Sequence, residues 1–109
     1  MMKPFLFCLI LHLLGAGQTI YITDHEYQAD LKVYSVNYEY QADLKVYKVN
    51  YEYQAGKNNG KWYFVEHGYQ ADSKVYFVEH EYQADLKIYF VDYEYQAGWK
   101  KKSKQHLLY

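Results

Sequence analysis

Histidine stands beside acidic residues at three places in the chain: Asp24-His25-Glu26, Glu66-His67 and Glu79-His80-Glu81. Imidazole and carboxylate groups together can bind zinc or another divalent ion, and a His beside a Glu can act as acid and base. In a strand, however, neighbouring residues point to opposite faces, so His80 and Glu81 cannot readily grip the same ion. A metal-dependent enzyme would need His25, His67 or His80 to converge from different strands.

The alternative interpretation is that these His side chains replace Tyr as flat rings with a polar tip. Other copies of the same pattern carry Tyr38, Tyr51 and Tyr93 at the matching positions, which we place on the inner face. The few Ser residues after the N-terminal segment are isolated, and the chain has neither a Gly-x-Ser-x-Gly frame nor a phosphate-binding loop. We therefore favour the Tyr-like role and predict no catalytic residue, no metal site and no cofactor.

Repeated Tyr-Gln pairs form the other candidate site. Aromatic rings and amides are the usual materials of carbohydrate sites, and an amide can also pair with a peptide. The structural alternative is that Gln satisfies buried Tyr hydroxyls or backbone groups of a turn, which we favour because half-buried hydroxyls need partners. The residues concerned are Tyr27, Gln28, Tyr40, Gln41, Tyr53, Gln54, Tyr69, Gln70, Tyr82, Gln83, Tyr95 and Gln96.

The elements that must position these residues are repeats. Tyr-Gln-Ala recurs at intervals of 13, 13, 16, 13 and 13 residues. A shift of 42 residues lays the first three copies on the last three, which indicates two similar halves, at about residues 20–61 and 62–102, of three units each. The extra residues of the long interval fall in the one clear loop, at residues 56–60.

Each unit contains an alternating stretch that is typical of a β-strand. Such stretches occupy residues 32–40, 45–53, 61–69, 74–82 and 87–95, with a shortened copy at 20–27. Tyr, Val and Ile favour a pleated, half-buried surface, and no helical period is present. We expect Tyr34, Val36, Tyr38 and Tyr40 to form the buried face and the residues between them to form the outer face.

The charge balance bears on the partners of the protein. Residues 18–99 carry 13 acidic side chains and 7 Lys, a net charge of −6, and the whole chain contains no Arg. Because phosphate recognition relies on clustered Lys and Arg, we expect no nucleic-acid partner. Lys100, Lys101, Lys102 and Lys104 follow as a basic segment, and we expect the C-terminal tail, residues 103–109, to fray.

The N-terminus is typical of an exported protein. A short basic start precedes an apolar run over residues 5–14, and Gly15-Ala16-Gly17 supplies the small residues that a signal peptidase needs. The run is too short for a membrane anchor, because ten helical residues cover about 15 Å of a hydrocarbon core of about 30 Å. We therefore predict a signal peptide at residues 1–17, a secreted or periplasmic protein, and membrane contact only through an uncleaved signal peptide.

The repeated motif resembles that of a small bacterial family known for the septoil knot. The residues that carry the resemblance are Tyr-Glu-Tyr-Gln-Ala-Asp-Leu-Lys-Val-Tyr and the closing Tyr-Gln-Ala-Gly-Trp, and it covers residues 20–102. It implies a compact β-rich domain threaded as a torus knot, with no biochemical activity attached to the family. Knots are nearly absent from proteins, so the resemblance alone carries that expectation.

These observations together predict an all-β fold. Six to seven short strands, built from 13-residue repeats in two pseudo-symmetric halves, would form one knotted domain over residues 18–102. The leading hypothesis for function is an exported structural or interaction protein without catalysis, and the alternative is a glycan- or peptide-binding module that uses the repeated Tyr and Gln. The specific partner, the choice between monomer and homo-oligomer, and the order of strand pairing stay open.

Overall fold

The computed structural model describes residues 17–108, so the expected signal peptide lies outside the described residues except for Gly17. No helix within 17–108 is long and apolar enough to cross a membrane. The strands are β1 (Gln18–Ile22), β2 (Leu31–Ser35), β3 (Leu44–Lys48), β4 (Lys61–Phe64), β5 (Ser73–Phe77), β6 (Leu86–Phe90) and β7 (Gly98–Trp99). The 3₁₀ helices are η1 (Glu26–Gln28), η2 (Glu39–Gln41), η3 (Glu52–Gln54), η4 (Gly68–Gln70), η5 (Glu81–Gln83), η6 (Glu94–Gln96) and η7 (Lys102–Leu108).

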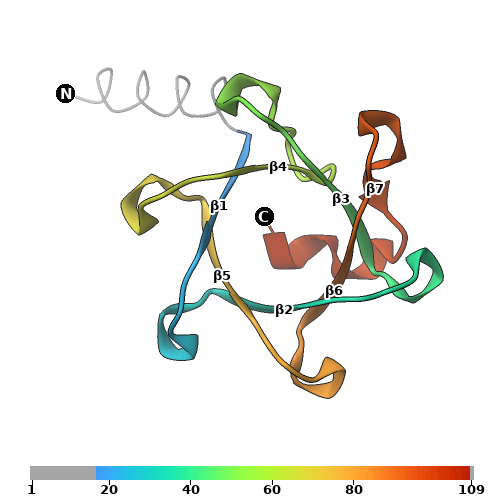
Figure 1. Ribbon diagram of the computed structural model, residues 1–109, viewed down its shortest axis with the longest axis horizontal. Helices are drawn as coiled ribbons and strands as arrows, with labels where there is room; N and C mark the ends of the chain where they lie inside the picture. The colour runs from blue at the N-terminus through green and yellow to red at the C-terminus, as the bar shows by residue number, and fades with distance from the viewer. Residues whose placement is uncertain (1–16, 109) are drawn as a thin grey trace.

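Six parallel strands close into a barrel, with the short 3₁₀ turns at its corners (Figure 1). The order around the ring is β4–β1–β5–β2–β6–β3, and β3 also pairs with β4, which closes the ring. β7 is added to β3 in the antiparallel direction. Closure leaves none of the six barrel strands with a free edge. The all-β prediction, with its six to seven short strands, is confirmed.

The chain passes twice round this ring. On each lap a connection skips one position, so β1, β2 and β3 alternate with β5, β6 and β4. The exception is the step from β3 to β4, which are neighbours. If the step after β3 also skipped one position, the chain would arrive at the position of β1. The loop at residues 56–60 leads instead to the adjacent position, so the strands of the second lap lie between those of the first. The two halves therefore interleave instead of packing as separate lobes.

Short connections are sufficient for this parallel arrangement because the strands are short. Eight residues join β2 to β3, and extended chain reaches about 3.3 Å per residue, or about 26 Å in all. A strand of five residues is only about 17 Å long, so the connection can turn outward and still return to the level at which the next strand begins. A crossover helix is not required.

The interior of the barrel is filled by aliphatic side chains and one Trp, not by Tyr. The prediction that Tyr34, Val36, Tyr38 and Tyr40 form the buried face is wrong for the Tyr residues. Val33, expected on the outer face, points inward in place of Tyr34, and β2 already ends at Ser35. Tyr34 is half-buried on the outside of the barrel, and Tyr38 and Tyr40 lie beyond the strand and are exposed. The inward residue near the middle of each barrel strand is fully buried: Ile20, Val33, Val46, Trp62, Val75 and Ile88.

The Asp of the repeat joins the two laps. In four units the Asp backbone N–H donates to a carbonyl of the neighbouring strand, and the Asp carboxylate accepts the N–H of that strand. Asp43 shows the pattern, since its N–H donates to Lys87 at 2.7 Å and its Oδ2 accepts the Lys87 N–H at 2.9 Å. The facing pairs are Asp30 with Lys74, Asp43 with Lys87, Asp72 with Thr19, and Asp85 with Lys32.

The C-terminal segment closes one end of the barrel. The expectation that residues 103–109 fray is wrong for the described residues, because η7 lies across the opening of the ring (Figure 1) and places Leu108 in the core. The Gln18 side chain donates to the Leu108 carbonyl at 3.0 Å. Asn58 in the inter-lap loop accepts the Trp99 indole N–H and donates to the Gln105 carbonyl, which ties this loop to η7.

We predict that Asp43→Ala lowers the free energy of unfolding by about 2–3 kcal/mol, because it leaves the Lys87 N–H without its carboxylate partner in a buried place and removes the ion pair with Lys104. Equilibrium denaturation with urea measures this loss. Asp30→Ala is the matched control, since exposed Asp30 accepts one equivalent N–H, and it should cost about 1 kcal/mol. Equal losses in the two variants would contradict the account.

Candidate binding site at the six turns

Each of the six turns presents two aromatic rings to solvent. The second ring is always the Tyr of Tyr-Gln-Ala, and these six Tyr side chains are between 75 and 84% exposed. The first ring, two residues earlier, is a Tyr or a His and is also exposed. The pairs are His25 with Tyr27, Tyr38 with Tyr40, Tyr51 with Tyr53, His67 with Tyr69, His80 with Tyr82, and Tyr93 with Tyr95.

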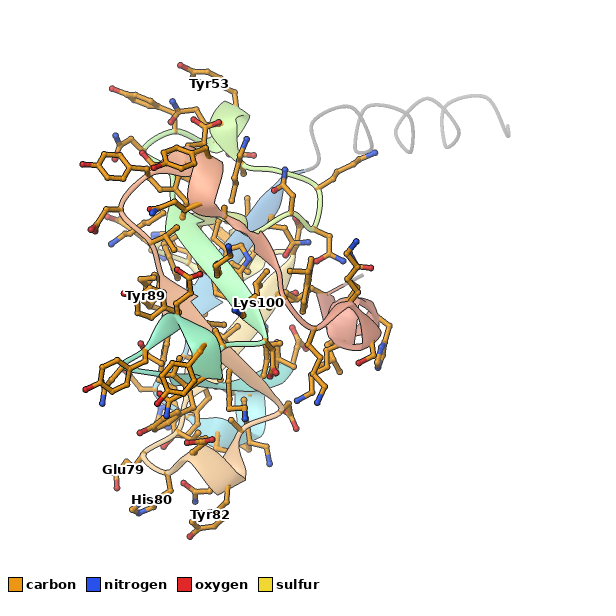
Figure 2. All side chains as sticks on the ribbon, turned by 90° about the vertical axis from the view of Figure 1, so that its right-hand side faces the viewer. Tyr53, Glu79, His80, Tyr82, Tyr89 and Lys100 are labelled. Atoms are coloured by element: carbon orange, nitrogen blue, oxygen red, sulfur yellow. The ribbon has the colours of Figure 1, made fainter. Side chains whose placement is uncertain are left out.

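The two rings of a pair lie close and nearly parallel. Their centroids are 5.5 to 6.0 Å apart, and five of the six pairs have interplanar angles between 14 and 21°. The pair His25–Tyr27 is tilted by 34°. These values fit offset stacking of aromatic rings. Tyr53 and Tyr82 point away from the barrel at opposite ends of the molecule in Figure 2, so the turns present separate sites.

The turn backbone holds the rings in place. In η5 the Gln83 N–H donates to the His80 carbonyl and the Ala84 N–H donates to the Glu81 carbonyl, which makes one 3₁₀ turn. The Gln83 side-chain Oε1 accepts the His80 N–H at 3.2 Å. The Gln of η3, η4 and η6 accepts the equivalent N–H of Tyr51, His67 and Tyr93, at 3.0 to 3.3 Å. Gln therefore serves the turn backbone, which is one of the two structural roles expected from the sequence.

In the first turn, Thr23 and not the Gln accepts the backbone N–H of the first ring residue. Thr23 stands where the other units have Val, and its hydroxyl donates to Gln28 Oε1 at 2.9 Å. The same hydroxyl oxygen accepts the His25 N–H at 3.2 Å. Here the Gln contacts the backbone only through Thr23.

In the sequence, a Glu separates the two ring residues of every pair except the fourth, where Gly68 replaces it. Four of these Glu residues pair with a Lys on the outside of the barrel at 2.8 to 3.9 Å. These ion pairs are exposed and contribute little to stability. They do place hydrogen-bond acceptors and donors beside the rings. The pairs are Glu26 with Lys32, Glu39 with Lys45, Glu81 with Lys87, and Glu94 with Lys61.

A surface hollow lies beside each turn that has a His in its ring pair. The hollow at η1 has a volume of about 590 Å³ and is lined by His25, Tyr27 and Lys32 among others. A second, also of about 590 Å³, lies beside His80 and Tyr82 of the η5 turn. A third, of about 520 Å³, lies beside the η4 turn and also contacts η3 through Glu52. Each hollow is open to solvent.

The structure corrects the placement of the three histidines. His25, His67 and His80 do replace Tyr, since they form the first ring of their pairs, but they lie outside and not on the inner face. They belong to separate turns, η1, η4 and η5. Among residues 17–108 no group of three or more His, Cys, Asp or Glu could hold a metal ion. The geometry offers no support for a metal-dependent enzyme.

The sequence analysis singled out the Tyr and Gln of every Tyr-Gln-Ala, but it did not single out the first rings, and it did not predict that the rings form pairs. The spacing of two between the rings was interpreted as the alternation of a strand, which would bury both. The odd length of the repeat, 13 residues, does indicate that the strand ends before the next unit begins. A strand that continued through it would reverse its faces from one 13-residue unit to the next, so the chain must turn there.

A family model described as the 7(1) septoil knot domain matches residues 17–100. Searches of the curated proteins and of the solved structures found no match. The family resemblance expected from the repeated motif is therefore confirmed.

We predict that Gln83→Ala and Tyr82→Ala separate the structural and the exposed parts of the motif. Gln83→Ala should lower the free energy of unfolding by about 1 kcal/mol, because the His80 N–H loses its acceptor. Tyr82→Ala should change it by no more than about 0.5 kcal/mol, because this ring is largely exposed. Urea denaturation of the two variants tests the difference. A larger loss for Tyr82→Ala would show that the ring pairs stabilise the fold.

Proposed function

Because the chain belongs to the septoil knot domain family, we propose that its interlaced barrel is a rigid scaffold whose six ring pairs bind glycans outside the cell. Family membership identifies a knotted structural domain. The finer role, binding without catalysis, is carried by one observation, the six stacked and exposed ring pairs. A protein with a purely structural role would have no need to keep so many large rings in water.

Glycans suit the chemistry of a turn. The apolar face of a sugar ring stacks on an aromatic ring, and its hydroxyls need donors and acceptors close by. At η5 the rings of His80 and Tyr82 supply the stacking surface, and Glu81 and Lys87 supply acceptors and donors beside it. The stacked rings are already held together by the turn, so few side chains lose freedom on binding.

Six similar sites favour a polymeric ligand. The turns stand at the corners of the ring (Figure 1), so neighbouring sites are held at fixed separations by the barrel. A second site that binds the same polymer acts at a high effective concentration, which raises the overall affinity without any new contact. Each single site can therefore be weak.

We predict retention on insoluble polysaccharides that depends on the second rings. The purified chain from residue 18 should bind at least one of cellulose, chitin and an insoluble β-glucan in a sedimentation assay. Replacing the six Tyr of Tyr-Gln-Ala by Ala should weaken that binding by about a hundredfold or more, since stacking is lost at every site. The matched control replaces the same six Tyr by Phe, which keeps the rings and should retain most of the binding.

Three outcomes would overturn the glycan proposal. The first is unchanged binding by the six-Ala variant while circular dichroism shows it to be folded. The second is the absence of polysaccharide binding together with ring-dependent binding of a Pro-rich peptide, which would make the turns peptide sites. The third is a chain that binds neither and that withstands proteinase K as a knotted core should, which would point to a structural role alone.

We also propose export, on the strength of the apolar run and the small residues that follow it. When the full chain is expressed in a bacterium, the protein should accumulate outside the cytoplasm, and N-terminal sequencing should begin at Gln18. Full-length protein in the cytoplasmic fraction would contradict this.

A further inference from the structure

The two ends of the barrel differ. η7 fills one end, where Leu108 joins the core. At the other end the last inward-facing residue of each strand borders solvent, and we call these six residues the mouth. They are Ile22, Ser35, Lys48, Phe64, Phe77 and Phe90. Four of the six are large and apolar.

The mouth exposes apolar surface that nothing within residues 17–108 covers. Ile22 is 46% exposed and Phe90 is 38% exposed, while Phe64 and Phe77 are partly buried against the core. The Phe64 ring lies 6.5 Å from the Phe90 ring and 6.0 Å from Trp62, so the cluster continues the core to the surface. The Lys48 Nζ lies 5.4 Å from the centre of the Phe64 ring, a cation–π contact.

Carboxylates surround the mouth. Two residues beyond each mouth residue lies an exposed polar side chain, and four of these six are acidic: Asp24, Glu66, Glu79 and Asp92. We call these four the rim. Figure 2 shows Glu79 on the side of the molecule away from η7, the side on which Tyr89, next to Phe90, also lies. Within the described chain none of the rim acids forms an ion pair, whereas most of the turn Glu residues do.

We propose that the mouth and rim bind a basic amphipathic segment of a partner protein. An apolar side chain of the partner would contact Ile22 and Phe90, and its Lys or Arg would pair with the rim. The charges favour this occupant over the others that an apolar patch could take. A second copy placed mouth to mouth would bring two rings of four carboxylates together, and an anionic lipid surface would meet the same repulsion.

A labelled peptide tests the proposal. The probe is a fluorescein-labelled amphipathic helix made of Leu and Lys, with a Leu and Glu counterpart, and anisotropy is measured on the chain from residue 18. The Leu/Lys peptide should bind saturably and the Leu/Glu peptide should not. Ile22→Ser with Phe90→Ser should weaken binding at least tenfold, because these are the most exposed apolar residues of the mouth. Circular dichroism checks that the variant is folded.

The charge component has a matched control. Asp24→Asn, Glu66→Gln, Glu79→Gln and Asp92→Asn together should weaken binding at least tenfold and reduce its dependence on salt. Replacing the paired turn residues Glu26, Glu39, Glu81 and Glu94 by Gln makes the same change in net charge and should leave binding within about twofold. Replacing the six Tyr of Tyr-Gln-Ala by Ala should also leave it unchanged, which separates this surface from the proposed glycan sites.

Several results would overturn the proposal. Equal loss in the rim variant and its control would mean that the peptide responds only to net charge. Binding of the Leu/Glu peptide, or no saturable binding of the Leu/Lys peptide, would remove the stated partner. A dimer in sedimentation velocity that Ile22→Ser with Phe90→Ser abolishes would assign the mouth to a second copy.

Discussion

The structure depends on parallel pairing between strands from different laps of the chain. β2 pairs through Leu31–Val33 with β5 on one side and through Val33–Ser35 with β6 on the other. Both neighbours come from the second lap, more than forty residues away in the sequence. No two strands of the first lap therefore pair with each other, and β3 with β4, at the lap change, is the one barrel pairing between strands that are consecutive in the sequence. Strand pairing is complete only when both laps are in place. The chain therefore loses most of its loop-closure entropy before it gains the free energy of strand pairing.

Pairing between the two laps explains why the same residues recur in each unit, which the resemblance to the family does not. Most crossings of the two laps have the same local geometry, so the same residues recur: an inward Val or Ile in every barrel strand except β4, which has Trp62, an Asp that joins the laps, and a turn that sends the chain outward and back. The Asp is absent after η3 and η6, where Gly56 and Gly98 stand instead. These are the two places where the chain leaves the regular step, to β4 and to β7. The irregular positions in the sequence are therefore the irregular positions in the topology.

The number of units and strands, the inter-lap loop and the family could be predicted from the sequence, but the predicted strands extend through the turns and their faces are assigned wrongly. Tyr, Val, Tyr and Tyr alternate over residues 34–40, and alternation says which residues share a face without saying where the strand ends. Six parallel strands enclose a narrow space, which takes Val33 and Ile88 but not rings from every strand. That limit belongs to the closed barrel and cannot be found in one unit. The aromatic pairs could not be predicted because the alternating pattern continues through Tyr38 and Tyr40, although β2 ends at Ser35.

The interleaving of the halves also has a meaning for the origin of such a chain. A single half would hold β1, β2 and β3 with an empty place between each pair, and it would have no sheet. Two separate copies of that half could fill each other's places and would form an intertwined dimer with the same six strands. The loop at residues 56–60 joins the end of one such copy to the start of the next. In this geometry, fusion of two entangled subunits would be a direct route from an intertwined dimer to a single knotted chain.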